Sequence, residues 1–356
     1  MKDAARHFSA SYAEARGRFL AAATEAGAAL SAHQHPLKGP EGEPLAVDVA
    51  RIGPASAARV IGLGSGTHGV EGYCGSGIQT ALLASGLARA LPADTAVVFI
   101  HAINPWGFAW GRRVNEDNVD LNRNFLDHER PYPENPGYEE IYAALNPPDL
   151  APATLDAGRA LLKTYAEKNG AAALQHALSG GQYVHPEGVQ FGGRGPVWSN
   201  RTLRAIIRAE FAAATRIVYV DLHSGLGPRA KGEVISTAPE TSGEFRRMKD
   251  WWGGIVHSTQ GPGSVSANVT GSITEVFSDE LQGREVSSCG LEFGTIPMNA
   301  VASALIADNW LHRNGGLDNP LAPAIKTQIR DAFYVDEDDW KEAVTRQTDE
   351  MIRRLL

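Results

Sequence analysis

Histidine and glutamate, two residue types that bind metal ions, stand three positions apart in a glycine-rich segment. His68 and Glu71 lie in the sequence IGLGSGTHGVEG, directly after an apolar run that is typical of a buried strand. A tight turn at this place would direct an imidazole and a carboxylate at one point, which is the geometry of a metal-ligand pair. The pair alone has little specificity, because a chain with 11 histidines and many acidic residues can produce it by chance.

Three further segments carry side chains suited to chemistry. Asn122 and Arg123 are adjacent and could hold a carboxylate with an amide and a guanidinium fork, although an isolated Asn-Arg pair is more simply a solvated loop in which Arg123 pairs with an aspartate. His223 ends the apolar run VYVDL, at the strand end where α/β sheets build their sites, but a single histidine there is more often structural. Glu292 lies in the apolar segment CGLEFGT, where a buried carboxylate requires a partner or a function.

Taken together and in this order, the segments resemble the zinc carboxypeptidase superfamily, which also contains succinylglutamate desuccinylase and aspartoacylase. The resemblance covers about residues 60–295 and is strongest to a bacterial carboxypeptidase-like branch long described as of unknown function. It rests on six features in order along the chain. These are the pair His68 and Glu71, the Asn-Pro-Trp-Gly-Phe stretch at 104–108, Arg113, the Asp-x-Asn-Arg-Asn stretch at 120–124, the strand-end His223 and the late-strand Glu292.

The resemblance implies one Zn²⁺ per chain, held by His68, Glu71 and His223 with an open position for water. It also implies that Asp120 accepts a hydrogen bond from His68 and so fixes the tautomer of that imidazole. Asp221 shares a strand face with His223 by the two-residue period, so it could line the site. For Asp221, however, a purely structural role is the better interpretation.

The same resemblance assigns roles in catalysis and in substrate binding. Glu292 would be the general base, which takes a proton from water and returns it to the leaving amine. Arg113, or alternatively Arg112, would stabilise the oxyanion. Asn122 and Arg123 would bind the terminal carboxylate of the substrate.

Two departures from the family pattern concern the substrate. Val70 stands before Glu71 where many carboxypeptidases have arginine, and residues 268–288 contain no tyrosine that could close over a peptide. A long Pro/Gly-rich stretch at about 126–200 separates the ligands and could wall the pocket, which would favour small substrates. We therefore expect a zinc metallopeptidase or amidohydrolase that cleaves an amide next to a free carboxylate, in a short peptide or a small metabolite. An N-acyl amino acid deacylase is the alternative within this class.

Other function classes fit less well. Residues 64–69 match the G-x-G-x-x-G pattern of dinucleotide-binding proteins, but the following strand ends in Phe-Ile-His instead of the acidic residue that would bind a ribose. No G-x-S-x-G surrounds Ser65, Ser76 or Ser224, which disfavours a serine hydrolase. A non-catalytic binding module on the same fold remains open, although all three ligands and the base are present.

The elements that must position these residues alternate between strand and helix, which predicts an α/β fold. The resemblance refines this to a single domain over 1–356 with a central twisted mixed sheet flanked by helices, a phosphorylase/hydrolase-like arrangement. We expect a helical insertion at about 126–200 and a helical tail at about 322–356, which packs on the body or on a second subunit. Strands are expected at 45–52, 59–63, 96–100, 217–222, 233–237 and 290–293, and helices at 12–30, 77–90, 154–178 and 201–214.

Composition limits the partners. The chain has 33 Lys and Arg against 41 Asp and Glu, a net charge of −8, and it has no long basic run, which excludes the electrostatic footprint of a nucleic-acid binder. Two cysteines, Cys74 and Cys289, are too few for a disulfide framework. The first 30 residues lack an uninterrupted apolar stretch, and no segment reaches the roughly 18 apolar residues of a membrane span. We expect a cytoplasmic protein without a membrane or nucleic-acid partner, with assembly into a homo-oligomer left open.

Overall fold

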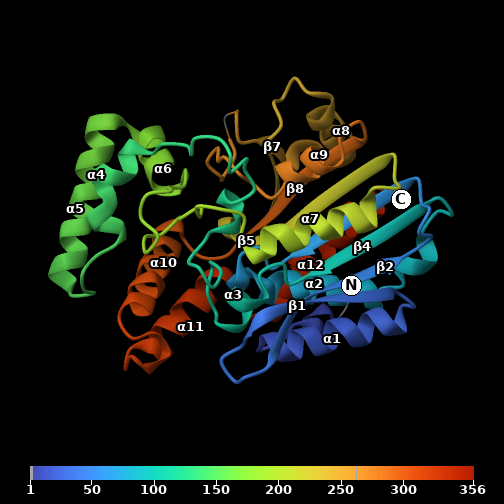
Figure 1. Ribbon diagram of the computed structural model, residues 1–356, viewed down its shortest axis with the longest axis horizontal. Helices are drawn as coiled ribbons and strands as arrows, with labels where there is room; N and C mark the ends of the chain where they lie inside the picture. The colour runs from blue at the N-terminus through green and yellow to red at the C-terminus, as the bar shows by residue number, and fades with distance from the viewer. Residues whose placement is uncertain (1–2, 262) are drawn as a thin grey trace.

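Eight strands form one mixed sheet in the computed structural model, which describes residues 3–261 and 263–356 (Figure 1). The strand order is β1-β2-β4-β3-β5-β8-β6-β7. The central strands β3, β4, β5 and β8 run parallel, whereas β1, β2 and β6 pair antiparallel with their neighbours β2, β4 and β8. The strands are β1 Ala29–Lys38, β2 Pro44–Ile52, β3 Arg59–Ser65, β4 Thr95–His101, β5 Arg216–Arg229, β6 Gly232–Ser236, β7 Val256–Ser258 and β8 Glu285–Gly294. The predicted α/β fold with a mixed central sheet is confirmed.

Two strands were not predicted from the sequence. β1 has the sequence ALSAHQHPLK and is mostly exposed, because it is an edge strand that pairs only with β2. β7 has only three residues. The predicted first helix is also too long, since Leu30 lies in β1. The helix begins after Ser11, whose hydroxyl accepts the backbone N–H of Glu14, and Gly27 with φ 71° turns the chain into the strand.

Helices cover both faces of the sheet. The α-helices are α1 Tyr12–Glu25, α2 Gly72–Ala84, α3 Pro105–Ala109, α4 Pro136–Leu145, α5 Pro152–Asn169, α6 Ala171–Ser179, α7 Trp198–Phe211, α8 Gly243–Trp252, α9 Glu275–Glu280, α10 Met298–Arg313, α11 Ala322–Phe333 and α12 Asp338–Arg353. Short 3-10 helices are η1 Ala4–His7, η2 Gly69–Glu71, η3 Leu87–Ala90, η4 Leu121–Arg123, η5 Gly253–Ile255 and η6 Gly316–Asp318.

The two-residue period of the central strands divides the core into two layers. Ile61 and Leu63 of β3 pack with apolar residues of α1, α2, α8 and α12, whereas Val60 packs with residues of α7 and α9 on the opposite face. Trp340 and Val344 of the tail lie in the first of these layers, so α12 packs on the body of the same chain. In Figure 1, α7 lies across the sheet, and α4, α5 and α6 stand at the far left of the molecule, beyond the end of the strands.

Aromatic packing explains the alternating glycines of β3, of which Gly64 is also the first glycine of the G-x-G-x-x-G segment. A side chain at Gly62 would come within 2.9 Å of the Phe211 ring, and one at Gly64 would come within 2.0 Å of the Tyr219 hydroxyl. The Tyr219 ring in turn stacks on Phe277, with 3.8 Å between the ring centroids. Gly62 and Gly64 therefore make room for the aromatic side chains of the α7 and α9 layer.

The stretch 126–200 contributes helices α4, α5 and α6. Their apolar side chains form a cluster of their own around Tyr138, Ile141 and Leu145. The glycine-rich end of the stretch returns to the body, where Asn124 donates from Nδ2 to the carbonyl oxygens of Gly192 and Gly195. Within residues 3–261 and 263–356, no helix combines the length and the apolar character needed to cross a bilayer.

Candidate metal centre

His68 and Glu71 lie in the turn that follows β3 at its carboxyl end. β3 ends at Ser65, and the 3-10 helix η2 Gly69–Glu71 then leads into α2. This turn lies against the chain at 107–113: the backbone N–H of Gly69 donates to the carbonyl of Arg113 at 3.0 Å, and a Cβ at Gly69 would come within 2.0 Å of the Gly107 backbone. Glycine at 69 therefore permits the close approach that places both side chains near His223 of β5.

The imidazoles of His68 and His223 both face the carboxylate of Glu71. Nδ1 of His68 lies 2.8 Å from Oε1 of Glu71, and Nδ1 of His223 lies 2.8 Å from Oε2 of Glu71. One ligand atom from each of the three residues lies within 4.8 Å of the other two, and all three side chains are buried. The structure thus brings together the three predicted metal ligands, although Glu71 and His223 are 152 residues apart in the chain.

Each imidazole has a carboxylate on its other nitrogen. Nε2 of His68 lies 3.1 Å from Oδ1 of Asp120, as the sequence predicted. Nε2 of His223 lies 2.6 Å from Oδ2 of Asp221, and the other oxygen of Asp221 accepts from the hydroxyls of Thr67 and Tyr219. Asp221 therefore contacts His223, one of the predicted metal ligands. The purely structural role that the sequence favoured for Asp221 does not include this contact. Its two-residue spacing from His223 was the signal that could have identified it.

Neighbouring charged side chains shift the pKa values of these buried groups. Burial raises the pKa of Glu71, but the adjacent His68 and His223 outweigh burial and hold that pKa well below its usual range. Burial would likewise lower the pKa of His223, whereas the carboxylates of Asp221 and Glu71 raise it well above the ordinary value. A deprotonated carboxylate between two imidazoles, each backed by a second carboxylate, is an arrangement typical of metal ligands.

Glu292 lies next to His223 in the sheet. The two residues are register partners on the parallel strands β5 and β8. Oε1 of Glu292 accepts the backbone N–H of Leu226 at 2.9 Å, and the side chain is buried. Burial and the nearby Glu71 carboxylate raise the pKa of Glu292 to about 7. A carboxyl with this pKa can both accept and release a proton near neutral pH.

The structure distinguishes the two adjacent arginines. Arg113 donates from Nη1 to Oε1 of Glu71 at 2.8 Å and from Nε to Oδ2 of Asp120 at 3.3 Å, so its guanidinium lies beside the predicted metal ligands. Arg112 turns away and pairs with Asp308 of α10 at 3.1 Å. Of the two candidates left open by the sequence, Arg113 is the one beside the His-Glu-His group.

Asn122 and Arg123 lie in η4, directly after Asp120. Oδ1 of Asn122 accepts the backbone N–H of Ile273 at 3.0 Å, which orients its amide. Arg123 is buried, and its guanidinium donates to the carbonyl oxygens of Asn122 and Ser179, with Oδ1 of Asp120 at 4.0 Å. Arg123 therefore contacts both Ser179 at the end of α6 and Asp120 beside the metal ligands. This arginine links the stretch 126–200 to the candidate site.

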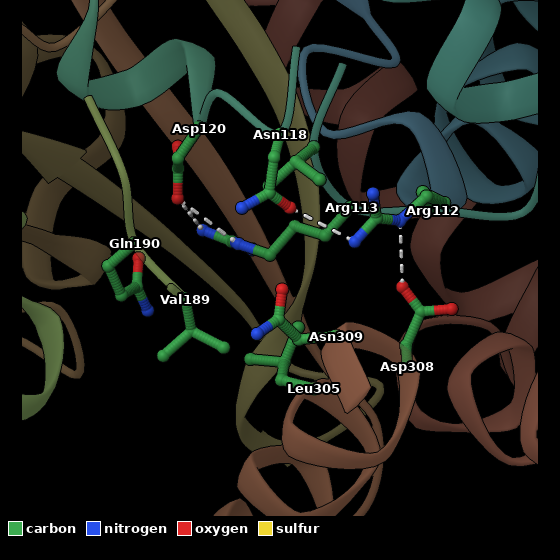
Figure 2. A pocket seen from close by; sticks show the side chains of 10 residues that line it. Arg112, Arg113, Asn118, Asp120, Val189, Gln190, Leu305, Asp308 and Asn309 are labelled. Carbon is green, nitrogen blue, oxygen red and sulfur yellow. Dashed lines mark hydrogen bonds and ion pairs between the residues drawn. The ribbon is translucent and has the colours of Figure 1, made fainter. Parts of the chain in front are cut away.

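A small pocket opens beside Arg113 and Asp120 (Figure 2). Val189 and Gln190 contribute one wall from the stretch 126–200, and residues of α10 contribute another. The lining residues are Arg112, Arg113, Val114, Asn118, Asp120, Val189, Gln190, Leu305, Asp308 and Asn309. Sequence reasoning suggested that the stretch 126–200 walls the pocket but did not identify Val189, Gln190 or the α10 residues.

The donor set fits a zinc ion. Two imidazole nitrogens and one carboxylate are a common ligand set for a catalytic zinc site. Nδ1 of His68 is buried and has no well-aligned hydrogen-bond partner among the described residues, so a lone pair is available on the side that faces Glu71. The Nε2 atoms of both imidazoles lie beside carboxylates, which would leave both Nδ1 atoms free to coordinate.

Comparison with known proteins places the chain in a family. A family model described as a protein of unknown function, DUF2817, matches residues 8–347. The search of curated proteins finds no match.

Among known structures, the chain is similar to carboxypeptidases and to a succinylglutamate desuccinylase. Carboxypeptidase A from Helicoverpa armigera is 15% identical, with 90% of this chain and 73% of that chain covered and a TM-score of 0.44. Bovine thrombin-activatable fibrinolysis inhibitor is 12% identical over 96% of this chain and 98% of that chain, with a TM-score of 0.46. Succinylglutamate desuccinylase from Chromobacterium violaceum is 16% identical over 88% and 71%, with a TM-score of 0.40.

Proposed function

The chain belongs to the family described as a protein of unknown function, DUF2817, and on that premise we propose that it is a zinc-dependent hydrolase of amide bonds. The observation that carries this proposal is the buried His68, Glu71 and His223 group with Glu292 as the register partner of His223. A metal-ligand set beside a carboxyl whose pKa is about 7 supports hydrolysis better than mere binding, because binding alone has no need of a proton acceptor.

His68, Glu71 and His223 would hold the zinc ion, which would supply Lewis-acid chemistry for a carbonyl and for water. The protein residues provide the rest. Glu292 accepts a proton from the attacking water and delivers it to the leaving nitrogen. Arg113, whose side chain is 17% exposed, donates to the oxygen on which negative charge develops. Asp120 and Asp221 hold the imidazoles of His68 and His223 in one orientation.

Asn122 and Arg123 are proposed to bind a free carboxylate next to the scissile amide. Their support is position: they stand two and three residues after Asp120, and Nη1 of Arg123 lies 4.0 Å from the Asp120 carboxylate. In the structure the Arg123 guanidinium donates to backbone carbonyl oxygens, so a substrate carboxylate would add to these contacts or replace them. The partner is then a short peptide or a small molecule with a free carboxylate, and an N-acyl amino acid is the alternative substrate class.

The test is hydrolysis by purified zinc-loaded protein of a panel of N-acyl amino acids and short peptides. Turnover should require zinc and should fall by roughly 10²- to 10⁴-fold in Glu292→Gln, which keeps the size of the side chain but cannot accept the proton. Glu244→Gln is the matched control, because Glu244 is another glutamate with a raised pKa beside β8, where it accepts the backbone N–H of Ser288 at 2.8 Å.

Two results would contradict the proposal. One is the absence of zinc-dependent turnover across the whole panel by a folded, zinc-loaded protein. The other is near-normal turnover by Glu292→Gln, which would remove Glu292 from the reaction.

A further inference from the structure

We propose that Thr67 and Tyr219 are positioning residues of the metal centre, because their hydroxyls fix the orientation of the Asp221 carboxylate. This inference rests on the proposed function, since it assigns a support of the zinc site that lies one layer outside the ligands. Neither hydroxyl has a hydrogen bond with His68, Glu71 or His223. Both therefore act on the metal centre only through Asp221.

The two oxygens of the Asp221 carboxylate have different surroundings. Oδ1 accepts from the Thr67 hydroxyl at 2.9 Å and from the Tyr219 hydroxyl at 3.0 Å. Oδ2 lies 2.6 Å from Nε2 of His223 and receives no hydrogen bond from the other described residues. Thr67, Tyr219 and Asp221 are all fully buried, so these contacts do not compete with solvent. One oxygen is thus held by hydroxyls, and the other is left for the imidazole.

Both hydroxyls give their single proton to the same oxygen. Within residues 3–261 and 263–356, Thr67 Oγ1 and the Tyr219 hydroxyl have no hydrogen-bond partner other than Asp221. A hydroxyl has one proton to donate, so both donors are used on Oδ1. Two donors on one oxygen fix the plane of the carboxylate, because it cannot turn without losing a buried hydrogen bond.

The two hydroxyls also connect the segments that carry the imidazoles. Thr67 directly precedes His68 in the turn after β3, whereas Tyr219 and Asp221 belong to β5, the strand of His223. The hydrogen bond from Thr67 to Asp221 therefore ties the turn to the strand. The imidazole ring centroids of His68 and His223 are 5.0 Å apart across this connection.

Packing places the Tyr219 hydroxyl from two sides. A Cβ at Gly64 would come within 2.0 Å of the hydroxyl oxygen and within 2.6 Å of Oδ1 of Asp221. The ring of Tyr219 stacks on Phe277 of α9. Glycine at 64 thus gives the hydroxyl its place beside Asp221, which assigns this glycine of the G-x-G-x-x-G segment to the metal centre.

The test removes both hydroxyls and measures zinc affinity by competition with a chromogenic chelator. Tyr219→Phe keeps the ring that stacks on Phe277, and Thr67→Val keeps the shape of the side chain. In the otherwise wild-type protein, the double variant should bind zinc about fivefold to tenfold more weakly, because the carboxylate can turn away from Nε2 of His223.

The same double change should have the opposite effect in an Asp221→Asn background. With both hydroxyls present, they hold the amide oxygen at the place of Oδ1, and the NH₂ group faces Nε2 of His223. Without them the amide can present its oxygen to Nε2, which leaves Nδ1 to the metal. The triple variant should therefore bind zinc at least about fivefold more tightly than Asp221→Asn alone. Hydroxyls that only stabilise the fold would not produce this reversal.

The matched control is Tyr12→Phe combined with Thr345→Val. Both residues are buried, and their hydroxyls donate to the backbone carbonyls of Ala46 and Lys341. This control should lower the melting temperature and leave zinc affinity unchanged in both backgrounds. If the triple variant does not fold, Tyr219→Phe alone is compared in the two backgrounds, where the same opposite shifts are expected at smaller size.

The inference is overturned if loss of the hydroxyls shifts zinc affinity in the same direction in both backgrounds, or if the control produces the same reversal. Zinc binding and turnover by the wild type are measured separately. A wild type that binds no zinc refutes the proposed function and this inference with it. Zinc binding without the reversal refutes only the roles of Thr67 and Tyr219, and the reversal without turnover refutes only the proposed reaction.

Discussion

Replacing Asp221 by asparagine is predicted to weaken zinc binding through a change at His223. Asp221 is fully buried, and its Oδ2 lies 2.6 Å from Nε2 of His223. Its Oδ1 accepts from the Thr67 hydroxyl at 2.9 Å and from the Tyr219 hydroxyl at 3.0 Å. With a metal ion bound, the carboxylate would therefore keep the proton of His223 on Nε2 and leave Nδ1, which lies 2.8 Å from Oε2 of Glu71, to coordinate.

Asparagine reverses this arrangement. The two hydroxyls hold the amide oxygen in the place of Oδ1, so the amide NH₂ group replaces Oδ2 and becomes a donor to His223. Nε2 must then accept, which moves the imidazole proton to Nδ1, the nitrogen that would coordinate the metal. Loss of such a partner typically costs 10- to 100-fold in metal affinity, or about 1.4 to 2.7 kcal/mol.

The assay is competition for zinc with a chromogenic chelator, with folding followed by circular dichroism. Asp308→Asn is the matched control, because Asp308 is also a buried aspartate but pairs with Arg112 and Lys326 on the α10 side of the molecule. It should lower stability and leave zinc affinity unchanged. A folded Asp221→Asn protein that binds zinc within about twofold of the wild type would refute the reasoning.

Three further predictions follow from the contacts of single residues. Arg113→Ala should lower kcat by roughly 10²- to 10³-fold with zinc retained. Arg112→Ala should chiefly lower the free energy of unfolding, by about 1.5 to 3 kcal/mol, because Asp308 loses one charged partner and keeps Lys326; equal effects on kcat would contradict the assignment. Amidating the substrate carboxylate should lower kcat/KM by roughly tenfold to a hundredfold, and unchanged kinetics would reassign Arg123 to a structural role. Burial, followed by the charge of Arg16, lowers the pKa of His101 to about 3. The neutral imidazole therefore contributes stability above pH 6.5 that is lost as the pH falls toward 3. The free energy of unfolding, measured with denaturant from pH 7 to pH 4, should depend less on pH in His101→Gln than in the wild type, and an equal dependence would contradict this role of His101.

The metal ligands were predictable because they lie in one short turn and directly after an apolar run, although β5 continues beyond His223 to Arg229. His68 and Glu71 share one turn, and His223 and Glu292 follow apolar runs that form the neighbouring strands β5 and β8. Each segment alone left a structural interpretation open, and it was the resemblance carried by the order of the motifs that implied the group; the structure brings its members together because β5 and β8 are parallel neighbours.

The remaining features depend on contacts between distant segments. Arg112 and Arg113 are adjacent in sequence, and the orientation of Arg112 is set by Asp308, 196 residues later in the chain. The exposure of Gln190 to the pocket depends on how the stretch 126–200 pairs with the loop that carries Asp120, through the Phe191 carbonyl. β1 was not predicted because it is an exposed edge strand and therefore lacks the apolar run by which the other strands were recognised.

The central claim is that His68, Glu71 and His223 hold one zinc ion. The test is elemental analysis of the purified protein after zinc loading and removal of excess metal. The zinc content of His68→Ala and His223→Ala is measured in the same way, after their melting temperatures have shown that both variants are folded. We expect one zinc per chain in the wild type and strongly reduced zinc in both variants, because each variant removes one of three ligands. Full zinc content in either folded variant, or a wild-type protein that retains no zinc, would contradict it.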